Sequence, residues 1–132
     1  MSESQAPSTR TRDGRRVVFL AAPYSQNPAA CIGAVCRVAT VMIESTAFTP
    51  VVPTLSMLWD TVTPRPYEWW SRVHLDVMQV CDAVLRLPGD SPGADREIEK
   101  ARSLGIPVLS LSEMPDTVSR TWHEESVRAG IV

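Results

Sequence analysis

The chain has 132 residues, 44% of them hydrophobic and 21% charged, which suits one globular domain with a packed core. The formal net charge of -2 gives no basic field for a phosphate backbone, so we expect no nucleic-acid partner. No run approaches the roughly 20 apolar residues of a membrane span, and no apolar stretch that would suit a secretory signal precedes Val17, so we expect a cytoplasmic protein without a membrane partner.

The first half of the chain predicts two strands and a helix behind a tail. Residues 1–15 are polar and lack periodicity, which predicts a disordered tail. The unbroken apolar run over 17–22 is typical of a strand buried on both faces. Apolar residues at helical spacing predict a helix over 28–46. Residues 48–53 predict a short strand near a sheet edge, because their prolines cannot donate to a central ladder.

The second half continues the alternation. After an expected loop over 54–65, helical periodicity returns over 66–81. Residues 83–88 and 106–111 predict two strands on either side of a helix over 94–104. The domain is expected over 16–111, and residues 112–132 as a C-terminal helix or tail. This alternation predicts an α/β fold: a single-domain flavodoxin-like or Rossmann-like parallel sheet of four to five strands with helices on both faces.

The stretch 88–97 runs from a strand through a glycine turn into a helix, and in such sheets ligands bind beyond the carboxyl ends of the strands. Ser91 stands where a helix N-cap belongs, and free N–H groups near Gly93 favour an anion. Glu97 falls in the apolar stripe of this helix with Ala94 and Ala101, so we expect it to face the crevice. It is either a buried carboxylate satisfied by backbone or arginine, or a nucleophile or acid/base beside a ligand.

Three further candidates lie on the helix expected over 66–81. Asp76 sits at the edge of an apolar stripe, where it is either a surface carboxylate or a group that contacts a sugar or protonates a leaving group. Trp70, with Trp59 and Trp69, either walls a base pocket or belongs to the core. His74 is a lone histidine and is expected as a rim contact only.

The loop after the first strand supplies the remaining candidates. Tyr24 follows that strand directly and can stack on a base or steer a carboxylate, and Ser25 and Asn27 can add hydrogen bonds. The three cysteines lack the spacing of zinc ligands, so no metal is expected. No Ser-His-Asp triad is visible from spacing.

Several motifs, in order, resemble the nucleoside 2-deoxyribosyltransferase superfamily. They are Ala21-Ala22-Pro23-Tyr24-Ser25, Asp76 with the later Cys81-Asp82, and Ser91-Pro92-Gly93-Ala94-Asp95-Arg96-Glu97 ahead of Gly105-Ile106-Pro107-Val108. The resemblance covers roughly residues 17–111. It is nearest to small members that are similar to nucleoside 5′-monophosphate N-glycosidases.

The resemblance implies a chemistry without metal or cofactor. Glu97 matches the nucleophile that displaces the base from the anomeric carbon of a (deoxy)ribose, Tyr24 the residue that orients it, and Asp76 a contact to sugar or base. Ser91 matches a phosphate-binding serine, which favours a nucleotide substrate over a nucleoside. The resemblance also implies a homodimer or larger homo-oligomer. The alternatives are a nucleoside 2-deoxyribosyltransferase, a non-catalytic nucleotide-binding or sequestering protein, and an oligomerising scaffold with a vestigial site.

Overall fold

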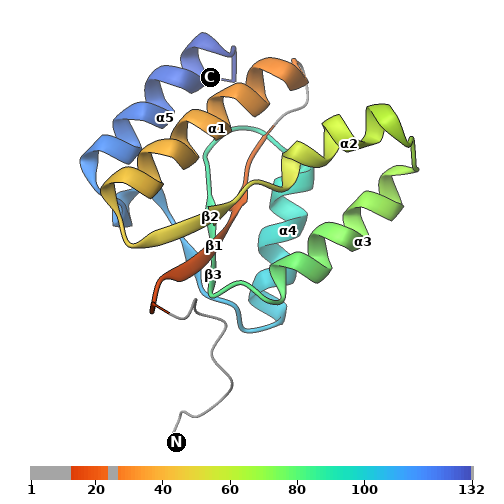
Figure 1. Cartoon of the computed structure of the whole chain (residues 1–132), viewed down its shortest axis with the longest axis horizontal. Helices are drawn as coiled ribbons and strands as arrows, with labels where there is room; N and C mark the ends of the chain where they lie inside the picture. Colours follow the sequence, from red (N-terminus) through yellow and green to blue (C-terminus); the bar gives the residue numbers. More distant parts are fainter. Residues whose placement is uncertain (1–12, 24–26, 132) are drawn as a thin grey trace, which may run out of the picture.

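The computed structural model describes residues 13–23 and 27–131, which form a parallel four-stranded sheet (Figure 1). The strands are β1 (Arg16–Ala21), β2 (Phe48–Val51), β3 (Ala83–Arg86) and β4 (Val108–Leu109), in the order β2-β1-β3-β4. This confirms the predicted parallel α/β sheet and the place of the proline-containing strand at an edge. Most of the tail expected over 1–15 lies outside the described residues.

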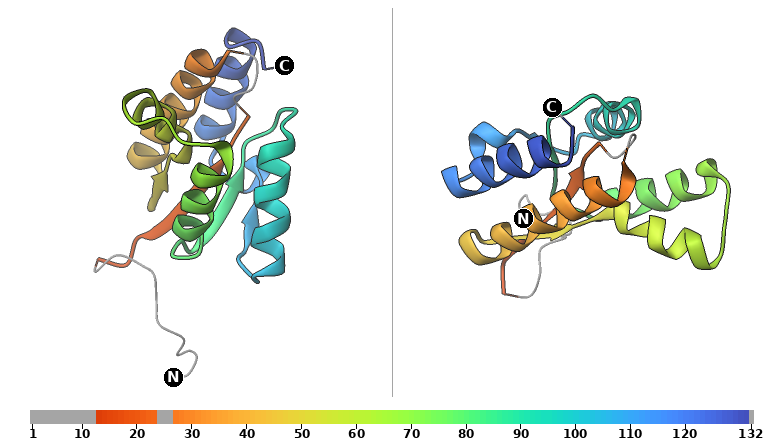
Figure 2. Two further views of the ribbon diagram at one scale, coloured as in Figure 1. Left: turned by 90° about the vertical axis from the view of Figure 1, so that its right-hand side faces the viewer. Right: turned by 90° about the horizontal axis from the view of Figure 1, so that it is seen from above.

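Helices cover both faces of the sheet, as the side view and the view from above in Figure 2 show. The cluster on one face joins β1 and β3 to α1 (Pro28–Ser45) and α5 (Asp116–Arg128). The cluster on the other face joins the same strands to α3 (Tyr67–Met78) and α4 (Pro92–Ser103). Since side chains alternate along a strand, Val18 and Leu20 of β1 face the first pair of helices, and Phe19 and Ala21 the second. The burial of both faces explains why β1 is apolar from Val17 to its end.

Within the part of the chain that the structure describes, α1 is the one helix long and apolar enough to cross a membrane by length and composition. Its buried residues pack in the core, where Val35 and Val38 are fully covered. Asn27 is its N-cap, and the Asn27 Oδ1 accepts a hydrogen bond from the Ala30 N–H at 3.3 Å.

The C-terminal segment is a helix, one of the two forms expected of it, and Trp122 anchors it. Trp122 of α5 is 2% exposed, and its Nε1–H donates to the Pro88 carbonyl at 3.1 Å. This contact ties α5 to the turn that leads into α4. The helix therefore packs as part of the same domain.

Replacing Trp122 with alanine is expected to lower the free energy of unfolding by about 3–5 kcal/mol, because it removes a buried indole and leaves a cavity. Urea denaturation followed by circular dichroism measures this loss. Val127→Ala on the same helix is the matched control, since Val127 is 54% exposed. An equal effect of the two substitutions would contradict the anchoring role of Trp122.

One prediction of secondary structure was wrong: most of the segment expected as a loop over 54–65 is helical. It forms a short 3₁₀ helix, η1 (Pro53–Leu55), and then α2 (Ser56–Val62). The second 3₁₀ helix, η2 (Leu111–Glu113), follows β4, which is shorter than the strand expected over 106–111. The figures show α2 and α3 as a hairpin that projects to one side of the sheet (Figures 1 and 2).

Candidate active site

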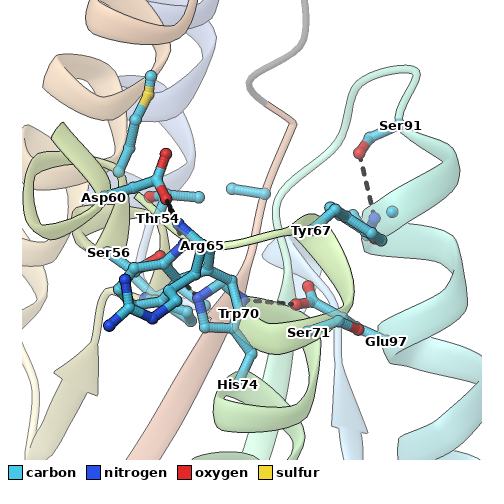
Figure 3. A pocket seen from close by; sticks show the side chains of 16 residues that line it. Thr54, Ser56, Asp60, Arg65, Tyr67, Trp70, Ser71, His74, Ser91 and Glu97 are labelled. Carbon is cyan, nitrogen blue, oxygen red and sulfur yellow. Dashed lines mark hydrogen bonds and ion pairs between the residues drawn. The ribbon is translucent and has the colours of Figure 1, made fainter. Parts of the chain in front are cut away.

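A cavity of about 270 Å³ opens between this hairpin, the start of α4 and the end of β1 (Figure 3). Leu20 and Ala22 also line it, which places the cavity at the carboxyl end of β1, where parallel sheets bind ligands. The polar groups on its walls come from η1, α2, the loop after α2, α3 and α4: Thr54, Ser56, Asp60, Arg65, Tyr67, Ser71, His74, Ser91 and Glu97.

Glu97 is held in the wall of this cavity by the packing of α4. Ala94, Ile98 and Ala101 of that helix are buried against the sheet, so the side chain between them is turned inward, as the sequence predicts. The Glu97 side chain is 21% exposed. Burial raises its pKa to about 7, although the positive charges of Arg86 and Arg96 act in the opposite direction. A carboxyl group with this pKa exchanges its proton near neutral pH.

His74, predicted from the sequence as a rim contact only, lies beside Glu97 in the wall of the cavity. Its Nδ1 is 3.8 Å from the Glu97 Oε2, and its Nε2 is 2.8 Å from the Ser56 Oγ. The His74 side chain is 14% exposed, and burial lowers its pKa below 6.5, partly offset by a hydrogen bond with the Pro53 backbone. The pair therefore combines a carboxyl group that holds its proton tightly with an imidazole that holds its proton weakly.

The buried carboxyl group predicts a stability change that does not depend on any activity. In the unfolded chain the Glu97 pKa is near 4.5, and in the fold it is about 7, so the carboxylate destabilises the folded state progressively above pH 4.5 and levels off above 7. Glu97→Gln is expected to raise the free energy of unfolding by about 1–3 kcal/mol at pH 8 and to change it little at pH 4. Denaturation of both proteins at the two pH values tests this, and a difference independent of pH would contradict it.

The hairpin side of the cavity holds a second carboxylate, Asp60. Its Oδ1 accepts hydrogen bonds from the Arg65 backbone N–H at 2.9 Å and from the Trp70 Nε1–H at 2.6 Å. These two hydrogen bonds hold the pKa of Asp60 below its usual range, and the bond from the Arg65 backbone has the larger effect. Trp70 is buried and also lines the cavity, so the pocket-wall interpretation and the core interpretation both hold for it.

The start of α4 offers a space for an anion. Ser91 is 7% exposed, and its Oγ caps the helix by accepting from the Ala94 N–H at 3.1 Å, which leaves its hydroxyl proton free to donate outward. A Cβ on Gly93 would lie 3.6 Å from the Tyr67 hydroxyl oxygen, 3.9 Å from the Arg96 Nη2 and 4.0 Å from the Ser91 Oγ. The glycine thus keeps open a space that these three polar groups surround. Tyr67 and Arg96 are in turn joined by a 2.9 Å hydrogen bond.

The structure does not bring every sequence candidate to the cavity. The Asp76 carboxylate is 63% exposed and lies 3.9 Å from the Arg72 Nε, so its expected place at the crevice is corrected. Two residues along a helix amount to about 200° of rotation, which turns Asp76 away from the face that carries His74. Asn27 caps α1 and is exposed, outside the cavity walls. Tyr24 and Ser25 lie outside the described residues, so their roles stay predictions.

Among residues 13–23 and 27–131, no three His, Cys, Asp or Glu side chains gather in a way that could hold a metal ion. The polar groups on the walls are the Glu97–His74 pair, several hydroxyls, the Asp60 carboxylate and Arg65. No family model matches the chain, and no curated protein or solved structure matches it either.

Proposed function

We propose that this protein is an N-glycosidase that hydrolyses the bond between base and sugar in a nucleoside 5′-monophosphate. The observation that carries the proposal is the inward-facing Glu97 carboxyl, which lies 3.8 Å from the His74 imidazole in a cavity beyond the strand ends. A carboxylate is the usual nucleophile toward an anomeric carbon, and a neighbouring imidazole supplies general acid and base catalysis. The resemblance to the nucleoside 2-deoxyribosyltransferase superfamily supports the same assignment of Glu97.

The reaction proceeds in two steps that conserve atoms and charge. In the first step, a Glu97 carboxylate oxygen attacks C1′, the C1′–N bond breaks, and the departing base takes a proton from the His74 imidazolium. In the second step, a water molecule attacks C1′ of the glycosyl ester, the bond to Glu97 breaks, and His74 accepts the water proton. Two inversions retain the anomeric configuration.

The 5′-phosphate occupies the space at the start of α4. The Ser91 hydroxyl, the Arg96 guanidinium and the N-terminal end of the helix all favour a negative charge there. The open space at Gly93 supports this placement, because a side chain would reduce the approach of an anion to the helix backbone. The proposal therefore favours monophosphates over nucleosides.

A panel assay tests the proposed function. The protein is incubated with nucleosides and their 5′-monophosphates, and free base is measured by chromatography. Release from monophosphates in water supports the proposal. Release only when a second base is added assigns a transferase instead, and saturable binding without release assigns a nucleotide-binding protein. Analytical ultracentrifugation of the same sample tests the expected homo-oligomer.

A further inference from the structure

We infer that Asp60 and Thr54 form a base-recognition subsite that selects amino-substituted nucleobases over their oxo counterparts. The inference rests on the proposed function, because it places a base opposite the reacting carboxyl group. Figure 3 shows Thr54 of η1 and Asp60 of α2 on one side of the cavity, across from Glu97 of α4 and its N-cap Ser91. A nucleotide with its phosphate at Ser91 and its sugar at Glu97 directs its base toward Asp60 and Thr54.

Asp60 is an acceptor of fixed orientation. Its Oδ1 is engaged by the Arg65 N–H and the Trp70 indole N–H, and its Oδ2 carries no hydrogen bond from any residue that the structure describes. An ionised carboxylate only accepts hydrogen bonds. The free oxygen therefore favours an N–H donor on the ligand and disfavours a carbonyl oxygen.

Thr54 supplies a second, adaptable group. Thr54 is 6% exposed and lines the cavity. Its Oγ1 is buried and has no hydrogen-bond partner among the described residues. A buried hydroxyl without a partner destabilises the free protein, and a ligand that bonds to it recovers this cost. Since a hydroxyl both donates and accepts, Thr54 matches whichever group stands next to the one that Asp60 contacts.

The two groups together distinguish an amino edge from an oxo edge. Adenine and cytosine present an amino group beside an unprotonated ring nitrogen, so Asp60 accepts from the amine while the Thr54 hydroxyl donates to the ring. Hypoxanthine and uracil present a carbonyl beside a ring N–H, which brings an oxygen against the carboxylate. Thr54 adjusts to that reversal and Asp60 does not. Selectivity is therefore expected to come from Asp60.

The test measures binding in the Glu97→Gln protein, so that turnover does not interfere. Isothermal titration gives dissociation constants for two matched pairs of monophosphates: adenosine against inosine, and cytidine against uridine. The amino member of each pair is expected to bind at least about 10-fold more tightly, the scale of one hydrogen bond to a charged group. In a protein that also carries Asp60→Asn, the preference is expected to vanish or reverse in both pairs. The amide keeps an oxygen for Arg65 and Trp70 and adds a donor for a carbonyl.

Two further variants separate recognition from general damage. Glu68→Gln removes an exposed carboxylate from the same hairpin and should leave both preferences unchanged. Thr54→Val should weaken binding of all four nucleotides by about 5- to 10-fold without reducing stability, because it removes a hydroxyl that lacks a partner in the free protein. Equal affinity within both pairs, or a preference that survives Asp60→Asn, would overturn the inference. Base release without a preference for amino bases would support the proposed glycosidase and contradict the base subsite. A preference for amino bases without base release would support the subsite and contradict the glycosidase.

Discussion

Glu97→Gln is expected to lower kcat for base release by at least about 10³-fold, because the amide is a far weaker nucleophile toward the anomeric carbon. Glutamine has the shape of glutamate, and the fold should persist. Near-ultraviolet circular dichroism checks the fold, and chromatography of the released base checks the rate. Glu99→Gln is the matched control, because Glu99 is an exposed carboxylate two residues further along α4. Turnover unchanged in Glu97→Gln would exclude the nucleophile.

A trapping experiment gives the same assignment a direct readout. A 2′-fluoro substituent on the sugar disfavours the positive charge that develops at C1′ and slows hydrolysis of the glycosyl ester. We expect such a nucleotide to leave a mass increment of one fluorosugar phosphate on the peptide that contains Glu97. A turnover-competent protein with no adduct, or with the adduct elsewhere, would point to direct attack by water or to another nucleophile.

His74→Ala is expected to lower kcat by about 10²-fold, the usual contribution of one general acid–base group. The reactive form of the pair has an ionised Glu97 and a protonated His74. It is the less populated of the two forms that carry one proton, because Glu97 holds a proton more tightly than His74 does. Acid protonates Glu97 and base deprotonates His74, so the native profile should be bell-shaped. Its limbs should report the coupled pair, one below pH 6.5 and one at about 7. The profile of the variant should lose its alkaline limb and rise with pH to a plateau as Glu97 ionises.

Asp76→Asn is the control for this experiment, since Asp76 lies on the same helix outside the cavity. It should keep both the rate and the bell shape. If Asp76→Asn lost activity and His74→Ala kept it, the roles of these two residues would be reversed, and α3 would have to present its other face to the substrate.

The sheet was predictable because its signals are local. The run over 17–22 is apolar on both faces, as expected of a strand with helices packed on both sides of its sheet. The proline of β2 indicates an edge strand, because proline cannot donate a hydrogen bond to a neighbouring strand. The helix α2 was missed for a physical reason: Leu58, Trp59 and Val62 are exposed, so this helix has no apolar stripe facing a core. Leu55, Leu58 and Trp59 do begin a helical spacing that Val62 continues, but the helix has only seven residues and lies between prolines, so the segment was predicted as a loop.

The site was predictable where one helix carries it. Glu97 sits between buried residues of α4, so a helical wheel turns it inward. On α3 the buried positions are Trp70 and Met78, four residues to either side of His74, whereas Val80 is 62% exposed. A stripe drawn from Trp70 through Val77 to Val80 is therefore right for the first two residues and wrong for the last, and it does not pass through His74. The bonds among Asp60, Arg65 and Trp70 join a helix, a loop and another helix, and no spacing rule anticipates them.

The walls of the cavity belong to two separate parts of the chain. Glu97, the proposed nucleophile, lies on α4, which packs on the sheet, whereas Thr54 and Asp60 of the proposed base subsite lie on η1 and α2. The proposed mechanism thus places the nucleophile and the base-recognition subsite on different elements, while His74 of α3 completes the reacting pair. Redesign at Thr54 and Asp60 that retains Ser56, the hydrogen-bond partner of His74, offers a route to altered base choice that keeps the proposed reacting pair in place.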